Sequence, residues 1–219
     1  MAQRRPRRRG AVPLDVASEV RGSLPAAVAG RAEAKLADAA RAYGRDRYGE
    51  ALTILRDLVR TLPEVSAVRE LYGLTFYRLG RWNDAVRELE SCYELSGSTD
   101  QHPVLADCER ALGHHDRVAE LWGELRQTGA GSDVLAEGRL VMAGSLADRG
   151  RFEEAIALLL GPAMRPVRRP LDRHLRQWYA LADLFERSGD LPRAREFFTK
   201  VVANDPELSD ATERLSAIG

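Results

Sequence analysis

A segment of about 34 residues recurs along the chain. The stretch DRYGEALTILRDLVRTLPE (46–64) aligns with GRWNDAVRELESCYELSGS (80–98) without a gap. Three further copies follow, and the alanine that recurs in the five copies is Ala51, Ala85, Ala119, Ala155 and Ala194. Sequence periods of 20 to 50 residues are typical of arrays of small units that each pack against their neighbours. The period therefore restricts the fold to a repeat array.

Each copy has the pattern of a helical hairpin. Beyond residue 24 the apolar residues follow a helical period, and no alternation is long enough for a strand. The recurring alanine would allow two helices to approach closely, because a larger side chain would separate them. Four turns between the helices carry a glycine that can take the left-handed conformation that ends a helix, namely Gly80, Gly113, Gly150 and Gly189. We therefore expect an all-α chain.

The copies resemble the tetratricopeptide repeat (TPR), whose pattern is W-x₂-L-G-x₂-Y…A-x₃-F…P. The fifth copy matches it with Ala for Gly and Phe for Tyr, at Trp178, Leu181, Ala182, Phe185, Ala194, Phe198 and Pro206. The third copy departs most, since Glu109 stands where an aromatic residue is expected. The resemblance covers residues 32–206, and the stretches LYGLTFYRLGRWNDAVRELE and PVLADCERALGHHDRVAELW also resemble small actinobacterial TPR proteins.

The resemblance implies a right-handed α-solenoid of about five helix-turn-helix repeats. The expected repeats are 32–64, 66–98, 101–129, 134–163 and 172–206, within a solenoid that spans 23–219. A final helix, 208–218, is expected to cap the array, because Leu208, Ala211, Leu215 and Ile218 share one face and polar residues the other. We expect residues 1–22 to be a disordered basic tail, and a looser joint or an irregular groove at the third repeat.

The resemblance also implies a concave groove, lined by the first helix of each repeat, that binds a peptide or a partner protein. The groove positions are Glu33, Leu36, Tyr43, Glu70, Leu74, Tyr77, Asp107, Arg110, Leu140, Asp148, Tyr179, Asp183 and Glu186. This mixed, somewhat acidic surface suits an extended or helical peptide that carries some positive charge. Leu36 and Ala40 occupy positions where the chaperone-binding carboxylate clamp needs polar or cationic residues, so that function is not expected. The alternative interpretation of any single groove residue is that it lies on a solvated face and binds no partner.

Two basic stretches offer a second interpretation, a nucleic-acid- or ribosome-associated accessory protein. The candidate anion-binding residues are Arg4, Arg5, Arg7, Arg8 and Arg9 in the head, and Arg165, Arg168, Arg169, Arg173 and Arg176 in the stretch 164–176. Arginine binds phosphate well, but neither stretch has interleaved aromatic residues for base stacking, and no nucleic-acid-binding motif accompanies them. We therefore favour a disordered solubilising tail, or one that contacts an acidic protein, as the interpretation of the head.

The sequence offers little for catalysis, and we expect neither an enzyme nor a metal or cofactor. His114, His115 and Cys108 could meet at one turn, but no second pair of ligands completes a four-ligand zinc site. We expect the two histidines to lie in a solvated turn and Cys92 and Cys108 to be reduced thiols. We also expect the tryptophans Trp82, Trp122 and Trp178 to pack between helices rather than to bind a ligand.

The chain has 33 basic and 33 acidic residues. Without the five head arginines the rest is mildly acidic. No secretory signal is evident, and the longest apolar run, 155–160, is too short to span a membrane. We therefore expect a cytoplasmic, non-enzymatic scaffold or adaptor, and a homo-oligomer is an open alternative.

Overall fold

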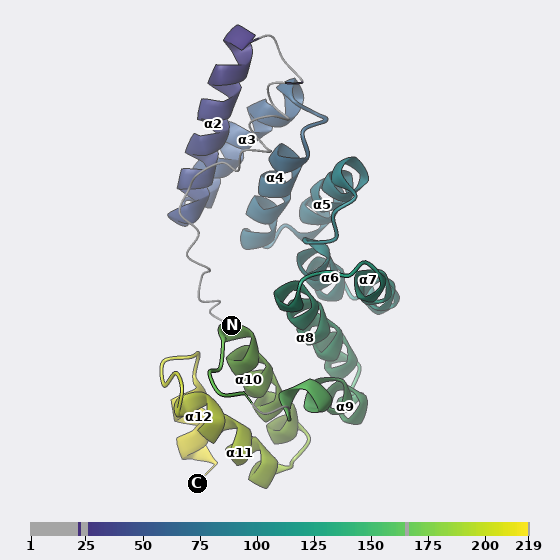
Figure 1. Ribbon diagram of the computed structural model, residues 1–219, viewed down its shortest axis with the longest axis vertical. Helices are drawn as coiled ribbons and strands as arrows, with labels where there is room; N and C mark the ends of the chain where they lie inside the picture. The colour runs from purple at the N-terminus through teal and green to yellow at the C-terminus, as the bar shows by residue number, and fades with distance from the viewer. Residues whose placement is uncertain (1–21, 23–25, 165–166, 219) are drawn as a thin grey trace. The chain divides into compact units, whose positions relative to one another are not determined.

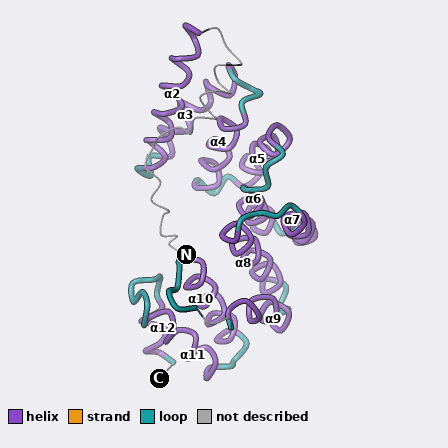
Figure 2. The backbone as a smooth tube through the Cα atoms, viewed as in Figure 1, coloured by secondary structure: helices purple, strands orange, loops and turns teal. Residues whose placement is uncertain are grey.

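The computed structural model describes residues 22, 26–164 and 167–218. All regular secondary structure in these residues is helical (Figures 1 and 2), which confirms the all-α fold class. The helices are α2 (Ala26–Gly44), α3 (Tyr48–Thr61), α4 (Ser66–Arg78), α5 (Trp82–Ser96), α6 (His102–Ala111), α7 (His115–Gln127), α8 (Ser132–Asp148), α9 (Phe152–Ala163), α10 (Asp172–Arg187), α11 (Leu191–Val202) and α12 (Ala211–Ala217). The expected basic tail lies outside the described residues, apart from Gly22.

The described chain divides into two compact units, which meet between residues 114 and 115. The N-terminal unit holds α2–α6, and the C-terminal unit holds α7–α12. Within each unit, consecutive helices pack as antiparallel hairpins, as α4 with α5 and α10 with α11 (Figure 1). The division falls between the two helices of the third repeat, which is the copy that departs most from the repeat pattern.

The five turns inside the repeats share one geometry. A residue in the left-handed conformation follows each first helix, and these residues are Asp46, Gly80, Gly113, Gly150 and Gly189. In every turn the N–H of the following residue donates to a carbonyl five residues back, as from Arg81 to Phe76 at 3.0 Å and from Asp190 to Phe185 at 2.8 Å. This pair of features is the Schellman end of a helix.

The first turn uses aspartate rather than glycine. Asp46 has φ 60°, and it accepts a hydrogen bond from the Tyr48 hydroxyl. Aspartate tolerates the left-handed conformation better than most residues because its short polar side chain bonds locally. The glycine pattern in the sequence therefore missed this turn.

Small residues stand where the paired helices approach most closely. Ala51, Ala85, Ala155 and Ala194 are each 0% exposed. In the third repeat, however, Ala119 is exposed, and Val118 is the residue that is 0% exposed. The expected position was therefore wrong by one residue, because the turn glycines of the second and third copies are 33 rather than 34 residues apart.

A second small position recurs in the first helices. Ala39, Gly73, Ala106, Ala143 and Ala182 all lie in the core. At Gly73 the packing is so close that an added Cβ would lie 2.8 Å from Leu89 Cγ and 3.2 Å from the Leu89 backbone nitrogen.

The tryptophans occupy helix interfaces to different extents. Trp178 is buried, and its indole N–H donates to the Ala163 carbonyl at 3.3 Å. Trp82 is half-buried, with its ring edge-on to Tyr77. Trp122 is also half-buried, with Arg139 5.6 Å from its ring centre. None of the helices within the described residues is long and apolar enough to cross a membrane.

Candidate functional site

The helix α4 presents one stripe of residues away from the core. Glu70, Leu74 and Tyr77 stand at the i, i+4 and i+7 positions, which share a face of a helix, and all three are half-buried. The opposite side of α4 carries the buried residues, such as Tyr72 and Phe76. The three groove residues predicted on this helix thus lie together on one face.

Two hydrogen bonds join this stripe to α6 and the residue before it. The Gln101 amide donates to Glu70 Oε1 at 2.6 Å, and the Tyr77 hydroxyl donates to Asp107 Oδ2 at 2.6 Å. The contacts advance together along both helices, so α4 and α6 run parallel. Asp107 also accepts a bond of 3.0 Å from Arg110 Nε.

Leu74 and Val104 lie midway between these two hydrogen bonds along their helices, and both are half-buried. Because each residue adds the same rise along a helix, the two apolar side chains stand at the same level. We call the surface formed by Glu70, Leu74, Tyr77, Gln101, Val104, Asp107 and Arg110 the α4–α6 face. It has an apolar centre with a hydrogen-bonded polar pair on either side.

The residues predicted on α2 contribute less than expected. Leu36 is only 4% exposed and belongs to the core. Tyr43 is half-buried, and its ring lies edge-on to Tyr48 with 5.4 Å between the ring centres. Burial raises the pKa of the Tyr43 hydroxyl, and the nearby Arg78 opposes this effect. Glu33 is half-buried further along the helix.

In the C-terminal unit, the predicted residues of α10 contact the last helix. Tyr179 is 8% exposed, and its hydroxyl donates to Asp210. Asp183 and Glu186 both accept hydrogen bonds from Arg214 of α12. These three side chains therefore already have partners inside the unit.

The predicted residues of α8 differ in exposure. Leu140 is half-buried and packs against the core of the C-terminal unit, whereas Asp148 is exposed at the end of the helix. Eight of the thirteen predicted groove residues belong to the N-terminal unit and five to the C-terminal unit. Five of those eight belong to the α4–α6 face, which is therefore the largest group of predicted residues within one unit.

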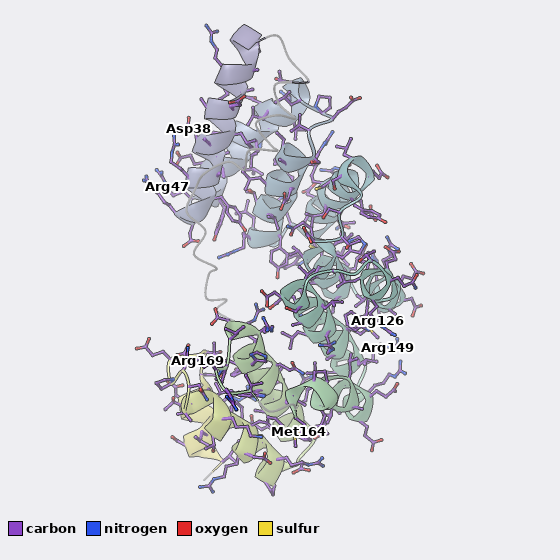
Figure 3. All side chains as sticks on the ribbon, viewed as in Figure 1. Asp38, Arg47, Arg126, Arg149, Met164 and Arg169 are labelled. Atoms are coloured by element: carbon purple, nitrogen blue, oxygen red, sulfur yellow. The ribbon has the colours of Figure 1, made fainter. Side chains whose placement is uncertain are left out.

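The basic stretch 164–176 is only partly a loop. Its last five residues belong to α10. Arg173 Nη1 lies 2.7 Å from Asp133 Oδ1, and Arg176 Nη1 lies 2.6 Å from Glu137 Oε1, so both arginines pair with acids of α8. Arg168 and Arg169 are exposed on the segment between α9 and α10, where Figure 3 labels Arg169. Arg165 and the five head arginines lie outside the described residues.

The histidines and cysteines take structural positions. His114 Nδ1 lies 2.7 Å from the buried carboxylate of Glu109, an interaction that the sequence did not reveal. His115 begins α7, and its Nδ1 lies 2.8 Å from Ser145 Oγ. The expectation that His115 lies in a solvated turn was therefore wrong. Cys92 and Cys108 are both reduced and buried.

The thiol of Cys108 is shielded from solvent. Burial, with smaller contributions from Asp107 and Glu109, raises its pKa to about 12. A thiol with such a pKa stays protonated at neutral pH and is a poor nucleophile. The described residues contain no group of three or more His, Cys, Asp or Glu side chains that could hold a metal ion.

The repeat geometry agrees with a comparison to known families. A family model described as tetratricopeptide repeat matches residues 35–95 and 140–209, which together make up more than half of the sequence. The chain belongs to the tetratricopeptide repeat family. The residues between the two matched ranges include the divergent third repeat of this TPR protein. Repeats of this family support protein-interaction scaffolds in general, and the family is generally non-enzymatic.

Solved TPR structures share the fold. TTC0263, a thermophilic TPR protein in Thermus thermophilus, is 18% identical with a TM-score of 0.67, and the match covers 85% of this chain and 98% of that chain. The apo form of the quorum sensor NprR from B. thuringiensis is 13% identical with a TM-score of 0.70, over 86% of this chain and 57% of that chain. YrrB is 13% identical with a TM-score of 0.53, over 83% and 90%. No curated protein matches the sequence.

Proposed function

We propose that this TPR protein is a scaffold or adaptor that binds a short segment of a partner protein on the α4–α6 face. The observation that carries the proposal is the pair of half-buried apolar residues, Leu74 and Val104, between two hydrogen-bonded polar pairs. Apolar residues at the centre of a polar-rimmed surface are typical of peptide-binding sites. YrrB, which is described as having an unusual peptide-binding site, supports a related use of the fold.

The charges of the face favour a ligand with some positive charge. The face carries two carboxylates, Glu70 and Asp107, and one arginine, Arg110, which bonds to Asp107. A peptide that places an apolar side chain over Leu74 would bring its neighbouring residues close to Glu70. We therefore expect an apolar anchor residue with lysine or arginine beside it.

The proposal is tested by Leu74→Glu. A carboxylate at the apolar centre would disfavour an apolar anchor and break no hydrogen bond of the face, so we expect at least a tenfold loss in the recovery of a crosslinked partner from cells that contain the protein. The matched control is Leu95→Glu, because Leu95 is 42% exposed on α5, the second helix of the same repeat.

Circular dichroism should first show that both variants keep the helix content of the wild type. Equal recovery of the same partner by both variants would contradict the assignment of the face. Replacing Tyr77 or Tyr179 by alanine is a poorer test, because each hydroxyl also joins two helices of the array.

Nucleic-acid binding receives less support from the described residues. Arg173 and Arg176 pair with acids of α8, although Arg176, like Arg168 and Arg169, is exposed in the described part of the 164–176 stretch. The test is RNA and DNA binding with and without residues 2–9 over a salt series. A steep salt dependence that disappears with the head would favour this second role.

We also propose a cytoplasmic location. Its support is the pair of reduced, buried thiols, Cys92 and Cys108, which is typical of a reducing compartment.

A further inference from the structure

The helix α12 stands where a sixth repeat would begin. In the N-terminal unit, Glu70 of one first helix is hydrogen-bonded to Gln101, the residue that precedes the next first helix, 31 residues later. In the C-terminal unit, Tyr179 stands at the same repeat position of α10 and is hydrogen-bonded to Asp210, the residue that precedes α12, also 31 residues later. The last helix therefore continues the series of first helices, and Figure 1 shows it beside α11 and α10.

The helix α12 buries little apolar surface against the rest of the C-terminal unit. The helix has seven residues, and Ala211 is its one fully buried residue. Leu215 and, just beyond the helix, Leu208 and Ile218 are partly buried against the core of the C-terminal unit. A helix this short is not stable without its neighbours, and Ser209 before it has a left-handed φ of 55°. Segments of this kind open at low free-energy cost.

One side chain of α12, Arg214, makes several polar contacts with α10. Arg214 Nη2 lies 2.9 Å from Asp183 Oδ1, and Arg214 Nε lies 2.8 Å from Glu186 Oε2. The guanidinium also donates to the Tyr179 hydroxyl at 3.2 Å and lies 4.8 Å from the centre of the Phe198 ring. Burial alone would lower the pKa of Arg214, but its bonds to Glu186 and Asp183 raise it.

These groups form a receptor for a guanidinium. Two carboxylates one helical turn apart repel each other unless a cation lies between them, and an aromatic ring adds a cation–π contact. If α12 dissociated from α10, Arg187 would neutralise only one of the two carboxylates, since its Nη1 lies 3.3 Å from Asp183 Oδ2.

We propose that the edge formed by α10 and α11 is a second docking site, which takes an arginine-bearing helix of a partner protein in exchange for α12. The partner helix has the chemistry of the segment it replaces, a small residue, then arginine and leucine, then an apolar residue, in the spacing of Ala211, Arg214, Leu215 and Ile218. α12 is thus an intramolecular ligand that limits access to the site. The site is separate from the α4–α6 face and does not depend on its function.

The test uses the full chain and a labelled synthetic peptide with the sequence of residues 208–218. The variant Arg214→Ala weakens the binding of α12 to α10. We therefore expect the peptide to bind this variant at least about tenfold more tightly than the wild type, in which α12 occupies the site. Adding Asp183→Asn and Glu186→Gln to that variant should abolish the gain. A peptide with glutamine in place of its arginine should bind the Arg214→Ala protein at least tenfold more weakly.

Equal or undetectable binding of the peptide to the wild type and to a folded Arg214→Ala protein would overturn the proposal. Hydrogen exchange of the wild type gives a test that needs no variant: the α12 amides should exchange faster than those of α11, and equal protection would show that α12 does not leave. Light scattering tests whether the occupant of the site is instead a second copy of this chain. A wild-type dimer that dissociates with Asp183→Asn and Glu186→Gln would mean that the site takes a second copy instead of a partner.

Discussion

At the scale of single residues, side-chain volume sets how closely the helices pack. The small residues of the first and second helices are buried in every repeat, with Val118 as the one larger exception. At Gly73 the approach to Leu89 leaves no room for a Cβ atom. The spacing within the second repeat therefore depends on the absence of a single methyl group.

Gly73→Ala should destabilise the protein. Alanine favours the helix by about 1 kcal/mol, but its Cβ would lie 2.8 Å from Leu89 Cγ and 3.2 Å from the Leu89 backbone nitrogen. Overpacking of this kind costs about 1–3 kcal/mol, so urea unfolding should show a net loss of about 1 kcal/mol.

The control for this change is Gly123→Ala in the middle of α7, where an added Cβ would meet no atom within 4 Å. Here the helix propensity acts alone, and stability should rise by up to about 1 kcal/mol. If Gly73→Ala proved as stable as Gly123→Ala, the close approach of α4 and α5 would not be a stabilising contact.

At the scale of elements, the third repeat replaces an apolar core residue by a carboxylate. Glu109 occupies the position held by Phe76, Leu146 and Phe185 in other repeats, four residues before the left-handed turn residue. It is 5% exposed and pairs with His114. Burying this carboxylate costs desolvation energy that the other repeats avoid.

Glu109→Leu should therefore stabilise the protein by about 1 kcal/mol, since replacing a buried charged group with a well-packed apolar residue is often stabilising. His114→Ala should act in the opposite direction, because it leaves the Glu109 carboxylate buried without this histidine. Both changes are measured by urea unfolding at neutral pH. A loss of stability in Glu109→Leu would indicate that the carboxylate itself supports the third repeat.

At the scale of the whole molecule, a repeat array has no single core, so its local stability follows the quality of each repeat and its neighbours. The third repeat has Val118 and Glu109 where the others have a small and an apolar residue, and the division between the two units falls within it. We therefore expect the array to open first at this repeat.

Hydrogen exchange should show this order. The amides of α6 and α7 should be less protected than those of α4 and α5 in one unit and of α10 and α11 in the other. Equal protection across these helices would show that the chain unfolds as one cooperative body.

Much of the architecture could be predicted from local patterns. The helical period, the turn glycines and the recurring alanine led to the helix pairs, because these features act over a few residues. The patterns failed at Asp46 and at Val118, where an unusual turn residue and a shift of one residue broke the period. The Glu109–His114 pair was also missed, because the polar partner of a buried side chain does not change the spacing of the apolar residues.

The predicted groove depended on contacts between helices, which local sequence patterns do not contain. A helical period identifies the side of a helix that faces away from the core, and Glu70, Leu74 and Tyr77 do share such a side. It cannot tell which polar groups there bind a neighbouring helix, because that depends on which helix lies beside them. Only the packed structure shows that Tyr179, Asp183 and Glu186 bind α12 while Leu74 and Val104 keep an apolar centre, since these contacts join residues about 30 positions apart.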